Sequence, residues 1–500
     1  MSNYPFSTPH TSTKIFLAQG TSLALCIVIA VTTFTLSALG KSFFDWSDAI
    51  YYLATAKYMM LQCSFAPLPT DFAFLTKILQ QPHYLPLNNY PNYGFEMLLG
   101  ILSVALKNFS LFNGILLSGL ITLLTALTLY GCAIRQLRDK GLAVLVVAGV
   151  LFHRVVFEIS PRPLSDSGLL LSWVLAVWAM LQNRTLLAGL ALGLGYFYRE
   201  HALLFLPFLP LLSPRCNSIK NYIKIVLPLA VAFAVGPFAA VICKNIYMQG
   251  GGADNLYAAH YKNAFRITTA SLTRLISHCK TYIINLGIVL LAVAFYILLR
   301  IRVMDNIVVR LFVVSLIIGG LPCILFIPNP TIPERYLAYV IPLLWLATAI
   351  MLKKAKYRYI YMAGMVALML ILRWPPAINS ASLKQLPQLD TAFSRLHEQV
   401  DAPFRLLAKE FSAKGAVLLS NAPPFALVSL DSPLEIRLPD YETFLNGPNN
   451  YILHGIVLIS SQSDWPDLPR IVDKAGVTFE RIGTPGELVP YLSIYKRVAL

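Results

Sequence analysis

The sequence predicts a polytopic α-helical membrane protein with a soluble α/β domain at its C-terminal end. Of its 500 residues, 57% are hydrophobic and only 13% are charged, about half the charged share of a soluble protein. Mean hydropathy is +0.63. Apolar runs close to the length of a membrane-crossing helix recur along the chain up to Pro376. Beyond Pro376 the composition becomes that of a soluble domain.

The membrane part is predicted to hold about eleven helices, found with windows of about 20 residues and the Lys/Arg bias of short loops. The first apolar run, from near Ile15, continues for about 25 residues, longer than the apolar part of a cleavable signal. Residues 41–92 follow as a polar and aromatic first outer loop. The expected spans are about 15–39, a second ending near 134, 142–156, 168–181, a fifth ending near 196, 202–212, a seventh ending near 242, 282–299, 308–327, 337–352 and 359–372.

Basic residues mark one face of the predicted membrane domain. They cluster in loops at 135–140, 215–224, 300–310 and 353–358, which the predicted spans place on the same side. Cytoplasmic loops carry the excess of Lys and Arg, so this face and the N-terminus are predicted to be cytoplasmic and the C-terminal domain extracytoplasmic. The same rule accounts for the net charge of +16. We expect no nucleic-acid partner, because no basic run is interleaved with aromatic residues on a soluble segment.

Two domains are expected: a membrane domain over 1–376 and an extracytoplasmic domain over 377–500. In the second, runs of β-branched and aromatic residues predict strands at 416–421, 451–460, 477–482 and 492–500, and 390–411 and 467–476 are predicted to be helical. This alternation predicts an α/β domain. The sequence contains no Gly-rich phosphate loop and no nucleophile elbow there.

The seven cysteines show no CxxC pair and no Cys/His spacing for zinc. Most lie in apolar runs and are interpreted as small core residues. Cys63 and Cys279 both fall in predicted outer segments, but nothing in the sequence supports a disulfide between them.

Ionisable side chains recur at the outer ends of the predicted spans. Such residues are costly at membrane depth and by default indicate a functional site. Arg binds phosphate through a planar fork, and a carboxylate serves as a general base or a metal ligand. The four groups are Asp45 and Asp48 after the first span; His153, Arg154, Glu158, Arg162 and Asp166 between the third and fourth; Arg199, Glu200 and His201 between the fifth and sixth; and Glu334 and Arg335 between the ninth and tenth.

The acidic residues also have an ordinary explanation as helix caps. Asp45 and Asp48 fit the N-cap and N3 positions of a helix running to about Met60, an acidic variant of the capping box. Asp166 fits the N-cap of the fourth span. Capping and catalysis are compatible, because one Asp can cap the helix while the other reacts.

The basic residues likewise allow a purely structural interpretation. Arg162 is placed to pair with Glu158, and Arg199 to extend to the membrane interface. Glu334 and Arg335 are placed to form a local ion pair. The sequence leaves these interpretations open beside a role in phosphate binding.

Four short motifs follow one another in a suggestive order. The first outer loop opens with DAIYYLATA, from Asp48, and closes with NNYPNYGFEMLLG, from Asn88. SPRPLSDSGLLL, containing Asp166, opens the fourth span; ERY with Pro342 comes late, after GLGYFYREHALLFLP. In this order, and with a soluble C-terminal domain outside the membrane, the chain resembles the GT-C membrane glycosyltransferases, the fold of protein O-mannosyltransferases and lipid A aminoarabinose transferases.

The resemblance implies an inverting sugar transfer from a polyprenyl-phosphate donor to a lipid, glycan or protein acceptor at the outer face of a bacterial cell (inner) membrane. It implies that an Asp of the first outer loop is the general base. The commonest family pattern there is an adjacent Asp-Glu pair, whereas this chain has D-W-S-D. Both Asp45 and Asp48 are therefore candidates, and the spacing to Tyr52 favours Asp48.

Donor phosphate and substrate binding would then fall to residues from all the outer connections: Arg199, Arg335, Glu334, Arg162, Asp166 and Tyr52. The chemistry requires no organic cofactor. It leaves open a divalent cation, Mg²⁺ or Mn²⁺, held by carboxylates near the phosphate.

Two other functions fit the same sequence. A transporter or flippase for an anionic solute or lipid would also hold charged residues among many spans. Transporters, however, often show two similar halves and broken midplane helices, and no internal repeat is evident here. A scaffold whose outer domain binds a partner would fit the change in composition after Pro376.

Overall fold

The computed structural model of the chain describes residues 9–39, the single positions 52, 56 and 60, then 94–107, 111–160, 165–247, 269–300, 304–325 and 334–373, and in the C-terminal part 417–420, 435–437, 455–460, 469–472, 478–481 and 492–498. The contacts within the chain divide it into two units. The first comprises residues 1–40, 118–242 and 256–380, and the second 41–117, 243–255 and 381–500.

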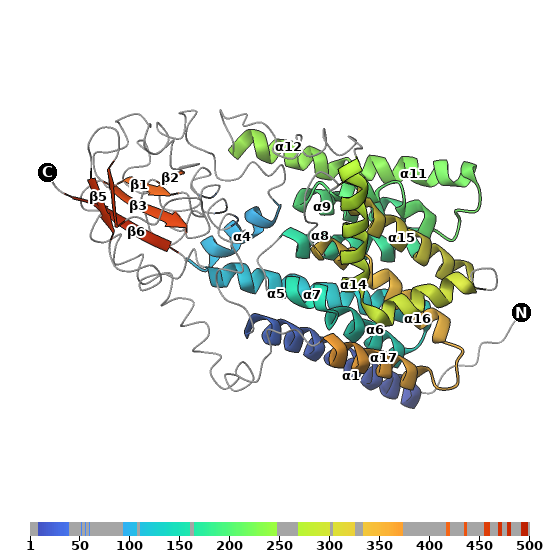
Figure 1. The fold of residues 1–500 in the computed structure, drawn as a ribbon. Helices are drawn as coiled ribbons and strands as arrows, with labels where there is room; N and C mark the ends of the chain where they lie inside the picture. The colour runs from blue at the N-terminus through green and yellow to red at the C-terminus, as the bar shows by residue number, and fades with distance from the viewer. Residues whose placement is uncertain are drawn as a thin grey trace, which may run out of the picture. The chain divides into compact units, whose positions relative to one another are not determined.

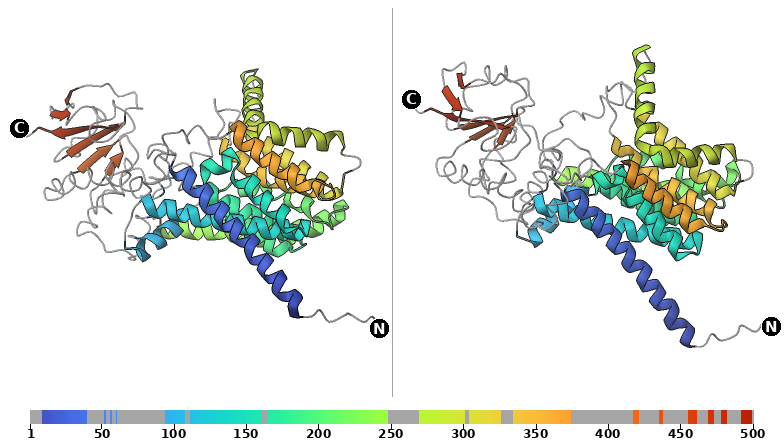
Figure 2. Two further views of the ribbon diagram at one scale, coloured as in Figure 1. Left: turned by 90° about the horizontal axis from the view of Figure 1, so that it is seen from below. Right: turned by 60° about the horizontal axis from the view of Figure 1, so that its bottom comes forward.

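The first unit is a helical bundle (Figure 1). Helix α1 packs against α6 and α7 and runs along one side of the bundle (Figure 2). Helices α5 and α12 continue into the second unit. In chain order the helices are α1 (Pro9–Leu39), α5 (Leu111–Leu137), α6 (Lys140–Leu151), α7 (Arg154–Ile159), α8 (Ser165–Leu181), α9 (Thr185–Tyr198), α10 (Ala202–Phe205), the 3-10 helix η2 (Leu209–Leu212), α11 (Ile219–Phe233), α12 (Val235–Tyr247), α14 (Thr269–Leu299), α15 (Asn306–Leu325), the 3-10 helix η4 (Glu334–Tyr339), α16 (Ile341–Leu352) and α17 (Arg358–Arg373).

Among the described residues, five helical stretches are long and apolar enough to cross a membrane, or six if the bent α14 is one span. The five are Gly20–Ala38, Asn113–Leu137, Ile219–Cys243, Asn306–Ile324 and Glu334–Leu352. Shorter apolar helices lie at several other predicted spans, including Lys140–Leu151, Ser165–Leu181, Thr185–Tyr198 and Arg358–Ile371. The helices thus lie close to where the sequence predicts them, while the number eleven stays a prediction.

The predicted span at 202–212 is wrong as a continuous helix. The structure has the four-residue α10, a turn, and then the four-residue η2. Pro207 and Pro210 lie inside this stretch. Proline lacks a backbone N–H and clashes with the preceding helical turn, so the segment breaks into two short pieces.

Helix α14 also departs from the prediction. It begins at Thr269, well before the span expected at 282–299, and is bent by 104° between Thr273–Gly287 and Leu290–Leu299. The break lies at Gly287, with φ 82° and ψ 152°. Only glycine adopts this backbone conformation without steric cost, so the sequence permits the bend at this residue.

The predicted basic loops lie together at one end of the bundle. The Lys353 ammonium donates to the Gln136 carbonyl (3.3 Å), and Arg358 contacts Asp139 (3.1 Å). Arg310 donates to carbonyls of the turn before α11, including that of Cys216 at 3.0 Å. Figure 1 shows these connections at the same end. The described parts of these loops therefore lie at one end of the bundle, while the assignment of that end to the cytoplasm stays a prediction.

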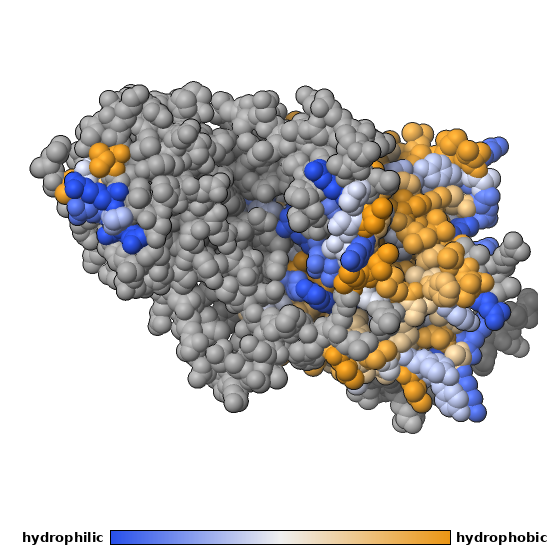
Figure 3. Space-filling view, viewed as in Figure 1, coloured by the Kyte–Doolittle hydropathy of each residue, from blue (hydrophilic) through white to orange (hydrophobic). Residues whose placement is uncertain are grey.

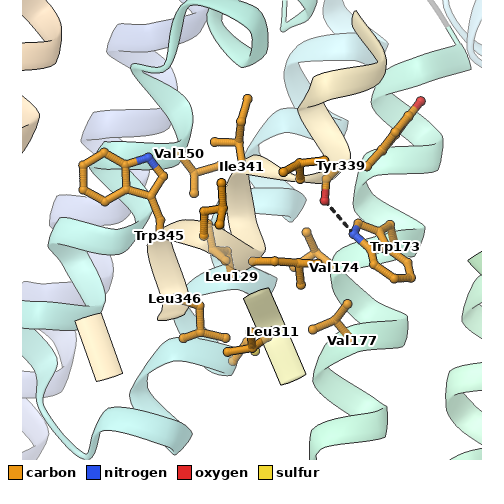
Figure 4. Packing of buried hydrophobic residues seen from close by; sticks show 14 of the residues in the cluster. Leu129, Val150, Trp173, Val174, Val177, Leu311, Tyr339, Ile341, Trp345 and Leu346 are labelled. Carbon is orange, nitrogen blue, oxygen red and sulfur yellow. Dashed lines mark hydrogen bonds between the residues drawn. The ribbon is translucent and has the colours of Figure 1, made fainter. Parts of the chain in front are cut away.

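Glycine at two positions of α9 permits close packing against α11 and α12. A Cβ on Gly189 would lie 2.4 Å from the Leu229 carbonyl oxygen, and one on Gly193 would lie 2.6 Å from that of Phe233. Small residues four apart allow this approach of helix backbones inside membranes. Deeper in the unit, Trp173 and Trp345 are fully buried among aliphatic residues (Figure 4).

Apolar side chains also cover the sides of the bundle. Along α11, Ile219, Ile223, Leu227 and Val231 follow one another four residues apart and are 58–81% exposed. Figure 3 shows hydrophobic residues over much of the described helical surface, with hydrophilic residues at its end. Exposed apolar area of this extent on a bundle is expected for a surface that faces lipid.

The second unit contains α4 (Gly94–Ala105) and a sheet. Tyr52 is 3% exposed, and its ring contacts that of Phe95 at 5.7 Å. The described strands are β1 (Val417–Ser420), β2 (Glu435–Arg437), β3 (Gly455–Ser460), β4 (Arg470–Val472), β5 (Thr478–Arg481) and β6 (Leu492–Arg497), in the sheet order β2-β1-β3-β6-β5-β4. Strands β2, β1 and β3 are parallel, and the remaining pairs are antiparallel.

Strands β1, β3, β5 and β6 lie within the four predicted strand segments. The prediction of a helix at 467–476 is wrong at its centre, because Arg470–Val472 is β4, paired with β5. Ile471 and Val472 are both β-branched, which suits a strand, and β4 lies at the edge of the sheet. The predicted helix at 390–411 lies outside the described residues, so the α/β class and the boundary at 376 stay predictions.

Candidate functional site

Asp166 is the centre of a buried polar cluster in the bundle. It lies in the first turn of α8 and is fully buried. Its Oδ1 accepts hydrogen bonds from the Arg199 guanidinium and, at 3.1 Å, from the Tyr339 hydroxyl. Its Oδ2 lies 3.6 Å from the Arg335 Nε. A carboxylate at the start of a helix is also favoured by the helix dipole.

The local sequence of α8 and α9 brings Asp166 and Arg199 together. A Cβ on Gly168 would lie 2.4 Å from Cδ1 of Tyr198, so only glycine leaves room for that ring. Likewise, a Cβ on Gly195 would lie 2.9 Å from Cδ1 of Leu169. The start of α8 therefore packs closely on the end of α9, whose next residue is Arg199.

The 3-10 helix η4 supplies the third side of the cluster. The Arg199 guanidinium lies 5.7 Å from the ring centre of Tyr336, and the His201 ring lies 4.9 Å from the same ring. The Tyr339 carbonyl accepts a hydrogen bond from the Trp173 indole at 2.9 Å (Figure 4). These contacts fix η4 against α8 and orient the Tyr339 hydroxyl toward Asp166.

The two guanidinium groups differ in their access to solvent. The Arg199 side chain is 5% exposed and that of Arg335 is 24% exposed. Arg199 is held within the cluster by a buried charged hydrogen bond, the strong kind of hydrogen bond. Arg335 contacts Asp166 at a longer distance and keeps part of its surface open. The single charge of Asp166 is thus shared by one buried and one accessible cation.

Glu334 belongs to the same region but interacts with a different element. It lies close enough to Arg154 to interact electrostatically. Arg154 also pairs with Glu158 one helical turn away, at 2.8 Å. Arg335 also meets Asp166 of α8, so its contacts extend beyond a local pair with Glu334. Glu158, the alternative partner of Arg162, is bonded to Arg154.

Glu200 and His201 connect α9 to α10 beside the cluster. Burial raises the pKa of the Glu200 carboxyl, and the neighbouring Arg199 opposes that rise. Burial, followed by the charge of Arg199, lowers the pKa of His201 to about 3. His201 is therefore neutral at physiological pH. The groups beside Asp166 that stay positively charged at this pH are therefore the arginines.

A helix break lies next to this region. His153 forms the N-cap of α7, where its Nδ1 accepts from the Val155 N–H. Its Nε2 lies 3.2 Å from the Leu286 carbonyl, immediately before the non-helical Gly287. Because Nδ1 accepts, Nε2 carries the proton and donates to that carbonyl. His153 thus satisfies a backbone group freed by the bend of α14.

The cluster lies at the end of the bundle away from the basic loops. Asp166 opens α8, Arg199 follows α9, and η4 precedes α16. The opposite ends of α8 and α9 meet at residues 182–184, where the Asn183 amide oxygen accepts from the Ser213 hydroxyl at 2.8 Å. Ser213 in turn accepts from Arg310. Among the described residues, the basic loops and the cluster of Asp166, Arg199 and Arg335 thus lie at opposite ends of the bundle.

The structure brings together some of the predicted site residues. Asp166, Arg199 and Arg335 form one cluster, and Glu334 lies next to it. Tyr52 belongs to the second unit, where it packs on Phe95. Asp45, Asp48 and Arg162 lie outside the described residues, so their roles stay predictions.

From the sequence, Tyr336 was identified only as part of the ERY motif, and Tyr339 was missed. Residues three apart eclipse each other on a 3-10 helix, but the sequence alone does not show that this segment is one. Tyr336 and Tyr339 have that spacing and follow directly after the predicted pair Glu334 and Arg335. Sequence reasoning also missed Glu96, which is fully buried in α4 of the second unit.

The described residues hold no group of three or more His, Cys, Asp or Glu side chains that could bind a metal. Asp166 is also unsuited to a divalent cation, because each of its oxygens faces a guanidinium group. A cation at this carboxylate would be repelled by Arg199 and Arg335. The divalent cation, which the sequence leaves open, stays a prediction.

No protein-family model and no curated protein sequence matches the chain. Three similar solved structures are of the oligosaccharyltransferase of Archaeoglobus fulgidus. The complex with Zn and sulfate has a TM-score of 0.48 at 14% identity, covering 88% of this chain and 68% of that one. The AglB complex with an inhibitory peptide and a dolichol-phosphate has a TM-score of 0.48 at 14% identity, covering 88% of this chain and 69% of that one. The apo form has a TM-score of 0.47 at 13% identity, covering 88% of this chain and 70% of that one. Likeness of this degree leaves the function to be argued from the chain's own residues.

Proposed function

We propose that this protein is an integral membrane glycosyltransferase that moves a sugar from a polyprenyl-phosphate donor to an acceptor hydroxyl at the outer face of the membrane. One observation carries the proposal. Arg335 and Arg199 share the buried Asp166, at the end of an apolar bundle opposite its basic loops, and Arg335 keeps 24% of its side chain exposed. An accessible guanidinium at that depth suits a lipid-linked phosphate.

Arg335 is assigned to the donor phosphate. The leaving group of the reaction is a lipid phosphate, whose developing charge a positioned guanidinium stabilises. Arg199 is too buried for direct contact and acts by holding Asp166, which in turn holds Arg335. Asp166 and Arg199 are thus positioning residues in this proposal. Glu334, beside Arg335, is assigned to accepting hydrogen bonds from the donor sugar.

The base is assigned to the first outer loop. Asp48 takes the proton of the acceptor hydroxyl, the acceptor oxygen attacks the anomeric carbon, and the bond from that carbon to the lipid phosphate oxygen breaks. The transition state has oxocarbenium character, as in other glycosyl transfers. One displacement inverts the anomeric centre. The loop carboxylates, Asp48 and Asp45, are also where Mg²⁺ or Mn²⁺ would bind, since Asp166 is occupied by arginine.

The test is sugar transfer by the purified full chain in lipid nanodiscs. A panel of polyprenyl-phosphate sugars is offered with lipid, glycan and peptide acceptors, and the released polyprenyl phosphate is measured. We expect release from at least one donor and a loss of about 10²–10⁴-fold in Asp48→Asn, the usual contribution of a general base. Asp139→Asn, at the basic end, is the matched control and should retain the wild-type rate.

The outcomes separate the parts of the proposal. Full activity of Asp48→Asn would remove Asp48 as the base and transfer the assignment to Asp45. A wild-type chain that releases no polyprenyl phosphate from any donor with any acceptor would overturn the transferase itself.

A transporter or flippase for an anionic lipid is the second candidate, because α14 is broken at Gly287 and broken helices are typical of transporters. Against it, the charged cluster lies at helix ends. Movement of polyprenyl phosphate across sealed vesicles, without any covalent product, would favour this candidate.

A further inference from the structure

The turn from α5 to α6 and the turn from α16 to α17 form one surface at the basic end of the bundle. We call residues 135–140 and 353–358 the basic surface. Helix α6 packs against both α16 and α17. Asp139 joins the two turns, because its Oδ2 accepts from the Arg358 Nε at 3.1 Å and from the Tyr359 hydroxyl at 2.7 Å. Two turns far apart in the sequence are thereby held as a single face.

The basic surface carries a large excess of positive charge. It contains seven Lys and Arg side chains, three in the first turn and four in the second, and one acid. That acid, Asp139, is paired with Arg358. Four of the cations are exposed and form no ion pair with any described residue: Arg135, Arg138, Lys354 and Lys356. Their charge is therefore available to a partner from outside the chain.

The cations at this end of the bundle have different tasks. The Arg310 guanidinium donates to the Cys216 carbonyl at 3.0 Å and to the Asn217 amide oxygen at 2.8 Å, so its charge holds the turn before α11. The Lys356 ammonium instead lies over the exposed ring of Tyr357, 5.3 Å from its centre. The face of an aromatic ring attracts a cation, and Tyr is enriched at membrane–water interfaces. Tyr357 thus positions the Lys356 charge at the surface.

An apolar stripe on α17 begins at the basic surface and continues along the helix. Its members share one side of the helix by their spacing and are 45–77% exposed: Tyr357, Ile360, Tyr361, Leu368 and Ile371. The opposite side of α17 is buried: Met362, Val366 and Met369. Midway the stripe passes Gly364, where an added Cβ would have no neighbour within 4 Å. Within the described part of the chain, the stripe is uncovered along its length.

We propose that this region binds one anionic phospholipid, with the lipid phosphate at Lys354 and Lys356 and an acyl chain along the stripe of α17. Basic sites between transmembrane helices bind the headgroups of anionic lipids. The stripe next to the cations favours an amphiphile over a free phosphate, which has no apolar part to cover it. The Lys and Arg excess that orients a membrane protein needs only enough cations in a loop, whereas this site needs these two lysines at the start of the stripe.

The test is the lipid retained by the full chain, immobilised in a non-ionic detergent and quantified by mass spectrometry after washing. Dioleoyl phosphatidylglycerol and dioleoyl phosphatidylcholine serve as probes, because both have the same acyl chains and a phosphate but only the first has a net charge. Each Lys or Arg near a lipid surface contributes about fivefold in affinity. We therefore expect the wild type to prefer phosphatidylglycerol about tenfold or more, and Lys354→Gln/Lys356→Gln to lose most of this preference. Both side chains are exposed, so the unfolding temperature without added lipid should stay that of the wild type.

The double variant Lys220→Gln/Lys224→Gln is the matched control. It removes two exposed lysines from the start of α11, which packs against α9 and η2. Both double variants change the net charge equally, so a site on the basic surface predicts that only the first loses the preference. Equal losses in the two would show a diffuse attraction of anionic lipid to this end of the bundle and would overturn the proposal.

Further probes decide between a lipid and other anions. At constant ionic strength, millimolar inorganic phosphate and a poly-glutamate peptide should each leave the phosphatidylglycerol in place. Displacement by either one would overturn a lipid as the ligand, and so would a wild type that retains both lipids equally. None of these measurements requires sugar transfer, so their outcome is independent of the proposed transferase.

Discussion

Arg199 donates to Asp166 across the interface of α8 and α9, with the two side chains 5% and 0% exposed. Removing one partner of such a pair leaves a buried charge uncompensated, which typically costs about 3–5 kcal/mol. We expect Arg199→Ala to lower the unfolding temperature strongly in detergent micelles. The same change at Arg154, whose pair with Glu158 is 33% and 21% exposed, should cost about 0.3–0.5 kcal/mol. Equal losses of stability in the two variants would contradict the larger contribution expected of the buried Arg199–Asp166 pair.

The approach of α8 to Tyr198 depends on a residue without a side chain. A Cβ on Gly168 would lie 2.4 Å from Cδ1 of that ring. We expect Gly168→Ala to displace Tyr198 and Arg199, lower the unfolding temperature and reduce sugar transfer. Gly131→Ala is the control, because its Cβ would have no neighbour within 4 Å and alanine favours the helix. Wild-type stability of Gly168→Ala would contradict this packing.

Acid should weaken the basic end of the bundle through Asp139. Burial raises the pKa of this carboxyl, but hydrogen bonds from the Leu142 N–H and the Tyr359 hydroxyl, with the charge of Arg358, outweigh burial and hold the pKa below its ordinary value. A carboxyl with a lowered folded-state pKa stabilises the fold above its unfolded pKa of about 3.9 and loses this contribution as the pH falls through the folded value.

We therefore expect the wild type to lose more stability than Asp139→Asn when the pH is lowered from about 6 to below about 4. The measurement is the unfolding temperature of both proteins across that range. Asp305→Asn, an exposed carboxylate in the turn between α14 and α15, should follow the wild type. Parallel curves for the wild type and Asp139→Asn would refute the role of this carboxyl.

The proposed orientation predicts which native cysteines a membrane-impermeant maleimide reaches. Cys279 is exposed beside the candidate site, and Cys216 lies at the basic end. In variants whose only remaining cysteine is Cys279 or Cys216, we expect Cys279 to be labelled in intact cells and Cys216 only after permeabilisation. The reverse pattern would place the cluster in the cytoplasm.

Much of the bundle follows from hydropathy, because apolar runs must form helices in lipid. The helices α15, α16 and α17 lie close to the predicted spans. The observed helices depart from the predicted spans where single residues interrupt a helix. Pro207 and Pro210 break the predicted span at 202–212, and Gly287 bends α14. Strand β4 was mistaken for helix because its residues pair with β5, and such pairing is not visible in a local pattern.

The candidate site was predictable only as a set of residue types. The sequence shows acids and arginines at outer connections, but it does not show that Arg199 meets Asp166, since that contact depends on how α8 and α9 pack. Packing also decides that the Arg335 side chain stays partly exposed while the Arg199 side chain is buried. Tyr339 was missed because nothing in ERYLAY alone marks its hydroxyl as a donor to Asp166.

Binding of polyprenyl phosphate to the full chain in nanodiscs tests the central claim most directly. We expect Arg335→Ala to weaken binding about tenfold or more, the effect of losing a hydrogen bond to a charged group, with an unfolding temperature near that of the wild type. Arg215→Ala, the same substitution at an exposed arginine of the basic end, should bind like the wild type. Unchanged affinity in Arg335→Ala would contradict the assignment of the donor phosphate to this cluster.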